Sequence, residues 1–175
     1  MKKIVLFTLM LSLNLLTAQS LFDKYEDYDT VTSVIVTEEM FKLLKEIDLE
    51  SEEAKEEIGI LSSLTSLKVF SVEDASTSQK IINDAKKYIQ KQKMVELMRI
   101  NDKDNKVRFY FIKGNKPHIA RELIMIVEPM KNNNNDTVVM VVTGNIDLKK
   151  LSKLNNKVKI IDSKYLKKVE AAQKE

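Results

Sequence analysis

From residue 94 onward the chain changes from a helical to an alternating pattern, and this change constrains the fold more than any other feature. Apolar and polar residues alternate over residues 94–100, 107–113 and 119–128, and residues 137–143 form a β-branched run. Short polar stretches rich in Asn, Asp, Lys and Gly separate these segments, which is typical of tight turns between antiparallel strands. The pattern therefore predicts a four-strand antiparallel meander in the C-terminal half.

The residues before this meander predict two more strands and several helices. The strands are β-branched runs, and the helices carry apolar residues at spacings of three and four behind a capping residue. Together with the meander they predict an α+β domain: a mainly antiparallel sheet of five or six strands with helices packed on one face. The predicted elements are strands at residues 30–36 and 67–72 and helices that begin at Thr37, Ser51 and Ser76.

The N-terminus has the order of a secretory signal. Lys2 and Lys3 precede an apolar run over residues 4–16, and Ala18 supplies the small residue before an expected cleavage at Gln19. The apolar run is shorter than the ~20 residues that span a bilayer. Because the chain contains no Cys that could be acylated, we expect a protein of the periplasm or secreted medium, without a stable membrane anchor.

The remaining chain is long enough for one domain. About 155 residues bury roughly two-thirds of their unfolded surface, so a core can form without disulfides. The expected division is a signal peptide at residues 1–18, a lead segment at 19–29, a single α+β domain at 30–161 and a Lys-rich tail at 162–175.

Several classes of site are not supported by the residue types present. His118 is the single His and Cys is absent, so neither a Ser-His-Asp triad nor a catalytic zinc site has its ligands. Gly59, Gly114 and Gly144 stand alone, which speaks against a phosphate-binding loop. Once Lys2 and Lys3 are set aside, the charge is close to neutral, which speaks against nucleic acid. We expect no cofactor and no metal.

Two acidic stretches have simpler explanations than metal binding. The glutamates of residues 50–57 are spaced to lie on the solvated face of a helix. Residues 101–105 resemble a calcium loop but lack its central Gly and its closing Glu, so a hairpin turn is favoured.

Two features remain as candidate sites. Asn145, Asp147 and Lys149 lie at the predicted start of the last helix and form a candidate interaction patch, although Asp147 also has the position of a simple helix cap. Thr30 and Thr137 each follow an Asp and precede a Val, as in an O-glycosylation acceptor of exported proteins. Thr137 is the better candidate, because it adjoins an Asn-rich loop.

Several segments together resemble an exported Bacteroidetes family known as domain of unknown function 4252. They are VTSVIVTEEMFKLL (31–44), VELMRINDKDNKVRFYFIKG (95–114), RELIMIVE (121–128) and VVMVVTGNIDLKKLSKL (138–154). The resemblance implies an exported α+β protein and implies no activity. Many members look like lipoproteins, from which this Cys-free chain departs.

We hypothesise that the chain is a non-enzymatic periplasmic domain that binds an unknown protein partner, in envelope stress or signalling. Two alternatives stay open: a hydrolase that acts on glycans with carboxylates alone, and a carrier of a small apolar ligand. The sequence indicates neither the partner nor the oligomeric state.

Overall fold

The computed structural model of the protein describes residues 20–46, 51–101, 103–130 and 136–150. The predicted signal peptide, the Lys-rich tail and the end of the last predicted helix, with Leu151 and Leu154, lie outside these residues. Within them, no helix is long and apolar enough to cross a membrane.

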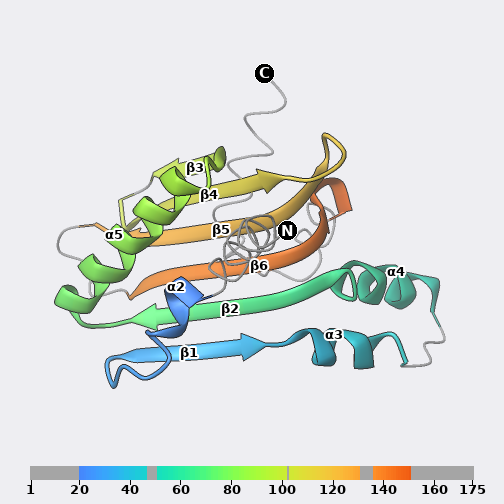
Figure 1. The fold of residues 1–175 in the computed structure, drawn as a ribbon, viewed down its shortest axis with the longest axis horizontal. Helices are drawn as coiled ribbons and strands as arrows, with labels where there is room; N and C mark the ends of the chain where they lie inside the picture. The colour runs from blue at the N-terminus through green and yellow to red at the C-terminus, as the bar shows by residue number, and fades with distance from the viewer. Residues whose placement is uncertain (1–19, 47–50, 102, 131–135, 151–175) are drawn as a thin grey trace, which may run out of the picture.

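The described residues form one six-stranded sheet in which every neighbouring pair of strands is antiparallel (Figure 1). The strand order is β1-β2-β6-β5-β4-β3. The strands are β1 (Val31–Val36), β2 (Leu64–Val72), β3 (Val95–Asn101), β4 (Asn105–Lys113), β5 (Ile119–Pro129) and β6 (Thr137–Asp147). The helices are α2 (Ser20–Asp23), α3 (Glu38–Leu44), α4 (Glu52–Leu61) and α5 (Ala75–Lys91). The predicted α+β class and the four-strand meander are confirmed.

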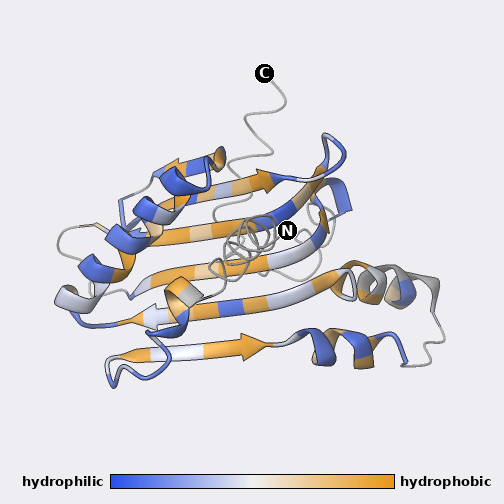
Figure 2. Ribbon diagram, viewed as in Figure 1, coloured by the Kyte–Doolittle hydropathy of each residue, from blue (hydrophilic) through white to orange (hydrophobic). Residues whose placement is uncertain are grey.

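The long helix α5 and the short α2 lie on one face of the sheet, here called the helix face. The buried side chains of α5, such as Ile81 and Ala85, pack on Phe70 of β2 and Ile124 of β5. The outward side of α5 is hydrophilic, whereas the strands are largely apolar (Figure 2). The prediction of helices on one face therefore holds for α2 and α5.

The opposite face of the sheet is apolar as well. Phe109 and Leu123 belong to a second buried cluster, which Phe41 of α3 and Leu61 of α4 join. The continuous apolar run of β6, residues 138–142, makes both faces of this strand apolar, since alternate side chains of a strand point to opposite faces.

Strand β6 is longer than predicted, because Gly144 continues the strand instead of ending it. Its φ of 142° is open to glycine alone among the common residues, and a Cβ there would lie 2.5 Å from the carbonyl oxygen of Ser63. Asn145 then donates its backbone N–H to the same Ser63 oxygen at 2.9 Å. The glycine thus permits a close approach between β6 and the start of β2.

Two predicted boundaries near helices were wrong. Strand β2 begins at Leu64, not at residue 67, because Ser62 and Ser63 end helix α4 with hydrogen bonds to carbonyl groups of its last turn. Helix α5 is capped by Asp74, whose Oδ2 accepts the backbone N–H of Thr77 at 2.6 Å, and not by Ser76.

Candidate functional site

The outer edge of β1 is the part of the sheet best suited to contact another molecule. Strand β1 pairs with β2 through six consecutive residues without a bulge, and no strand of the described residues pairs with its other side. Such an edge presents unpaired backbone N–H and C=O groups that can bind an added strand. Figure 1 shows β1 at one border of the sheet, with α3 continuing from its end.

The residues of this edge carry no charge. From Thr30 to Thr37 every side chain is apolar or a hydroxyl. Thr32 and Val34 are exposed, and the exposed fraction of Val34 is 53%. A natural edge strand is usually protected by a Lys, a Pro or a bulge. Strand β1 has none of these.

Helix α3 extends this apolar surface beyond the end of the strand. Phe41 is buried in the core, but Met40 and Leu43 are exposed by 50% and 58%. The apolar side chains of α3 cover a wider face of the helix than the face that packs on the sheet, so Met40 and Leu43 remain exposed. We call the exposed set Val34, Met40 and Leu43 the β1–α3 shoulder.

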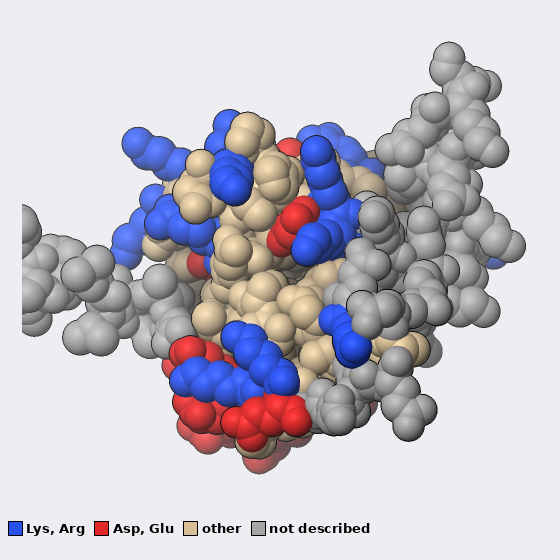
Figure 3. Space-filling view, turned by 90° about the vertical axis from the view of Figure 1, so that its right-hand side faces the viewer, with Lys and Arg blue, Asp and Glu red and all other residues tan. Residues whose placement is uncertain are grey.

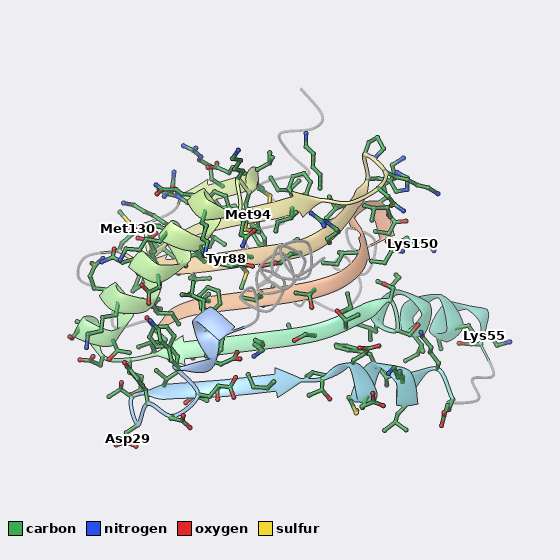
Figure 4. All side chains as sticks on the ribbon, in the orientation of Figure 1. Asp29, Lys55, Tyr88, Met94, Met130 and Lys150 are labelled. Atoms are coloured by element: carbon green, nitrogen blue, oxygen red, sulfur yellow. The ribbon has the colours of Figure 1, made fainter. Side chains whose placement is uncertain are left out.

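Acidic groups flank both ends of the strand. Glu38 and Glu39 open α3, where both contact Lys42 at 3.3 and 2.8 Å. At the other end a pocket of about 390 Å³ is lined by Asp29, Thr30, Thr32, Glu73 and Asp74. Figure 4 shows Asp29 at the end of β1 that lies away from α3. The edge is therefore an uncharged strand between two negative ends.

One carboxylate of the pocket, Asp74, is held by a hydrogen bond from the start of α5. Asp74 accepts the backbone N–H of Thr77, and this hydrogen bond lowers the pKa of its carboxyl. Thr30 donates to the hydroxyl of Thr77 at 3.2 Å, which ties the start of β1 to α5. The described residues contain no group of three or more His, Cys, Asp or Glu that could hold a metal ion. The pocket favours a cationic or hydrogen-bonding group, not an apolar ligand.

The segment that leads into β1 is held by polar contacts to α5 and β2. The Tyr25 hydroxyl donates to Asp84 at 2.8 Å, and Lys24 contacts the same oxygen at 2.5 Å. Burial, followed by the hydrogen bond to Asp84, raises the pKa of Tyr25. Lys68 of β2 reaches Asp23 and, at 3.3 Å, Glu26. These contacts fix the lead segment and so present the β1 edge in one position.

A buried carboxyl lies far from this edge, between α5 and the sheet. Glu122 is 8% exposed and accepts the Tyr88 hydroxyl at 3.0 Å, and burial raises the pKa of its carboxyl. Tyr88 points from α5 toward the sheet (Figure 4). Glu122 does not line the pocket, whose Asp74 has a lowered pKa. The pairing of a raised and an ordinary carboxyl across a cleft, which a glycan hydrolase needs, is not seen among the described residues.

The chain matches the family model for a domain of unknown function, DUF4252, over residues 25–154. The chain belongs to the DUF4252 family. No curated protein and no solved structure matches it. The matched span of this DUF4252 domain contains all six strands, the pocket and the β1–α3 shoulder.

The predicted interaction patch of the DUF4252 domain is only partly brought together. Asp147 Oδ1 accepts the backbone N–H groups of Lys149 and Lys150 at 3.0 and 3.3 Å, so Asp147 caps the helical turn that follows β6, as predicted. Asn145 lies within β6 and bonds to Ser63 through its backbone. Whether the patch binds a partner stays a prediction.

The two candidate O-glycosylation sites differ in exposure. The expectation that Thr137 is the more exposed of the two was wrong. Thr137 is 2% exposed because it opens β6 opposite Val72 of β2. Thr30 is exposed beside the pocket. Modification of either residue remains a prediction, and Thr30 is now the accessible one.

Sequence reasoning missed the β1–α3 shoulder of this DUF4252 domain. The signal available was the uncharged run at residues 30–37, followed by a helix with too many apolar positions for one buried face. That run was interpreted as an ordinary strand, since nothing local in it distinguishes an edge strand from a central one.

Proposed function

We propose that this DUF4252 domain is a non-enzymatic exported module that binds an extended segment of a partner protein along the outer edge of β1. Backbone hydrogen bonds to β1 would supply affinity, and alternate side chains of the segment would rest on the β1–α3 shoulder. The observation that carries the proposal is a regular, uncharged and unpaired edge strand next to exposed apolar side chains.

The chemistry of the edge narrows the partner. Between the strand ends an alternating apolar and hydroxyl segment fits Thr32 and Val34. At the ends, Glu38 and the pocket carboxylates of Asp29 and Glu73 favour basic residues. The preferred segment is therefore an extended stretch of about six residues with Lys or Arg at its ends.

A direct test uses the full chain and the synthetic peptide Lys-Val-Thr-Val-Thr-Val-Lys as the probe. Titration followed by heteronuclear NMR should slow amide hydrogen exchange in β1 and leave exchange in β3 unchanged. Val34→Lys should weaken binding roughly tenfold, since it places a charge on the edge next to the peptide lysines.

The matched control is Leu97→Lys on β3, an equally exposed apolar residue of the other edge strand at 45%. This variant should bind the peptide as the parent chain does. Equal weakening by both substitutions, or binding without protection of β1, would contradict the proposal. Failure of the peptide to bind at millimolar concentration would also count against it.

A further inference from the structure

A second charged surface lies at the end of the sheet where β4 turns into β5. Lys113, Lys116 and Arg121 belong to this turn and its flanking strands, and Lys149 and Lys150 follow β6. All five side chains are exposed. We call this set the basic end.

Backbone contacts hold the two segments of the basic end together. Within the turn, Gly114 donates its N–H to the Ile119 carbonyl at 2.8 Å. Ile119 pairs with Asp147 in the β5–β6 ladder, and Leu148 donates to the carbonyl of His118 at 3.0 Å. These hydrogen bonds hold the β4–β5 turn beside the end of β6. The two segments that carry the five cations are therefore neighbours, although about 30 residues of chain separate them.

The three cations of the turn and its flanking strands have no ion-pair partner among the described residues: Lys113, Lys116 and Arg121 form no ion pair there. Asp147 accepts two backbone N–H groups and also attracts Lys150. Figure 3 shows basic side chains over the upper part of this end, with acidic ones among them, and side chains of both charges below.

We propose that the basic end binds the phosphate-bearing headgroups of an anionic lipid membrane. Lysine is a compact point charge that attracts an anionic surface without requiring a fixed partner geometry. The cations surround an exposed turn at Asn115, Lys116 and Pro117, which can approach a flat surface from outside. Such binding is reversible and independent of the β1 edge, so the domain could hold a partner segment while resting on a membrane.

Nucleic acid is the rival polyanion, and the basic end suits it less. Binding of single strands uses aromatic side chains on which bases stack, and duplex recognition places a helix or a ribbon in a groove. The turn offers Asn115, Pro117 and lysines instead. The basic end therefore suits a membrane better than a nucleic acid.

The experiment measures co-sedimentation of the full chain with vesicles of phosphatidylglycerol and phosphatidylcholine in equal amounts, and with vesicles of phosphatidylcholine alone. Each cation near an anionic surface contributes about fivefold in partitioning, so Lys113→Gln with Lys116→Gln should lower binding to the anionic vesicles about 25-fold. Because residues 4–16 are apolar and identical in all variants, their contribution cancels in the comparison.

The matched control is Lys80→Gln with Lys87→Gln, which removes the same charge from exposed positions of α5. This control should lower binding less than twofold. Equal loss in both double variants would overturn the proposal, since it would mean an effect of net charge alone. The same conclusion would follow if Lys113→Gln with Lys116→Gln bound the anionic vesicles as well as the parent chain does.

Two further arms distinguish the source of the anion. Inorganic phosphate and chloride at matched ionic strength should release the protein from vesicles equally. Stronger release by phosphate would show a discrete phosphate site and overturn the membrane assignment. Tighter binding to a 20-base-pair DNA duplex than to the anionic vesicles, lost in the turn variant, would overturn it in favour of nucleic acid.

Discussion

The two edge strands of the sheet are built in opposite ways. Strand β3 has a register shift between Glu96 and Met98, and Glu96 forms a two-bond ion pair with Arg99 at 2.5 and 2.9 Å. Strand β1 has neither a bulge nor a charge. A bulge and charges are the usual means of preventing a foreign strand from adding to an edge. The difference indicates that β3 is protected and β1 is left available.

Exposed apolar residues do not explain this contrast by themselves. Val95 and Leu97 of β3 are exposed by 42% and 45%, close to the 53% of Val34. What differs is the regularity of the backbone and the presence of charge beside the apolar residues. Apolar exposure therefore identifies a docking edge only where the strand is also regular and uncharged.

The largest expected effect is a difference in unfolding free energy between substitutions of a buried and an exposed residue of α3. Phe41→Ala should lower the free energy of unfolding by about 3–5 kcal/mol, because it empties a buried site in the core below the β1 edge. Leu43→Ala on the same helix, 58% exposed, should change it by less than about 0.5 kcal/mol. Urea denaturation measures both values. A cost above 2 kcal/mol for Leu43→Ala would mean that the shoulder is structural.

A smaller effect follows from removing the protection of β3. Glu96→Thr with Arg99→Thr keeps the bulge and removes both charges, and should strengthen self-association on the order of tenfold. Light scattering over a range of protein concentrations measures this change. The control Lys86→Thr with Glu128→Thr removes an ion pair between α5 and the central strand β5, outside both edges. If that control associates as strongly, the charges of β3 have no particular protective role.

Acidification should loosen the segment that leads into β1. Burial disfavours the charged form of Asp84, but hydrogen bonds from Lys24 and Tyr25 outweigh it and lower its pKa. A carboxyl with a lowered pKa stabilises the fold above its unfolded pKa of about 3.9, and this contribution is lost as the pH falls through the folded value. Amide exchange in β1 should therefore rise as the pH falls below about 4, and Asp84→Asn should abolish this rise.

The control for this pH effect is Glu122, a carboxyl whose pKa is shifted in the opposite direction. Burial raises the pKa of Glu122, so its ionisation opposes folding as the pH rises from the unfolded toward the folded value. Glu122→Gln should stabilise the protein at neutral pH, with the gain vanishing in acid. Asp84→Asn should do the reverse. Parallel pH profiles for the two variants would exclude the assigned contacts.

Periodicity predicted most elements of the fold, but not the order of the strands. The four segments predicted from residue 94 onward were each found as strands, because alternation, β-branched residues and turn residues are local signals. The predicted last strand stopped at residue 143, because the role of Gly144 is a close approach to Ser63 that no local pattern reveals. Thr137 was expected in solvent because its sequence neighbours are polar, whereas its partner Val72 is distant in sequence.

Prediction of the candidate site also required knowing which distant segments of the chain pair with one another. The run at residues 30–37 predicts a strand, but whether that strand lies at an edge follows from β2 pairing with β6 on its other side. The pocket likewise joins Asp29 with Glu73, which are neighbours only through the β1–β2 ladder. The cap at Asp147 was predicted correctly, because a cap needs only the residues next to it.

The smallest expected effect concerns the junction between β1 and α3. Thr37 has the backbone position of a helix cap, but its side chain makes no capping hydrogen bond, whereas Ser51 of α4 accepts the N–H of Ala54 at 3.1 Å. Thr37→Ala should therefore change the free energy of unfolding by less than about 0.3 kcal/mol, and Ser51→Ala should lower it by about 1 kcal/mol. Thermal unfolding of both variants measures the difference. A cost at Thr37 equal to that at Ser51 would show that its hydroxyl holds the end of β1, and the edge would then be less independent of α3 than its contacts indicate.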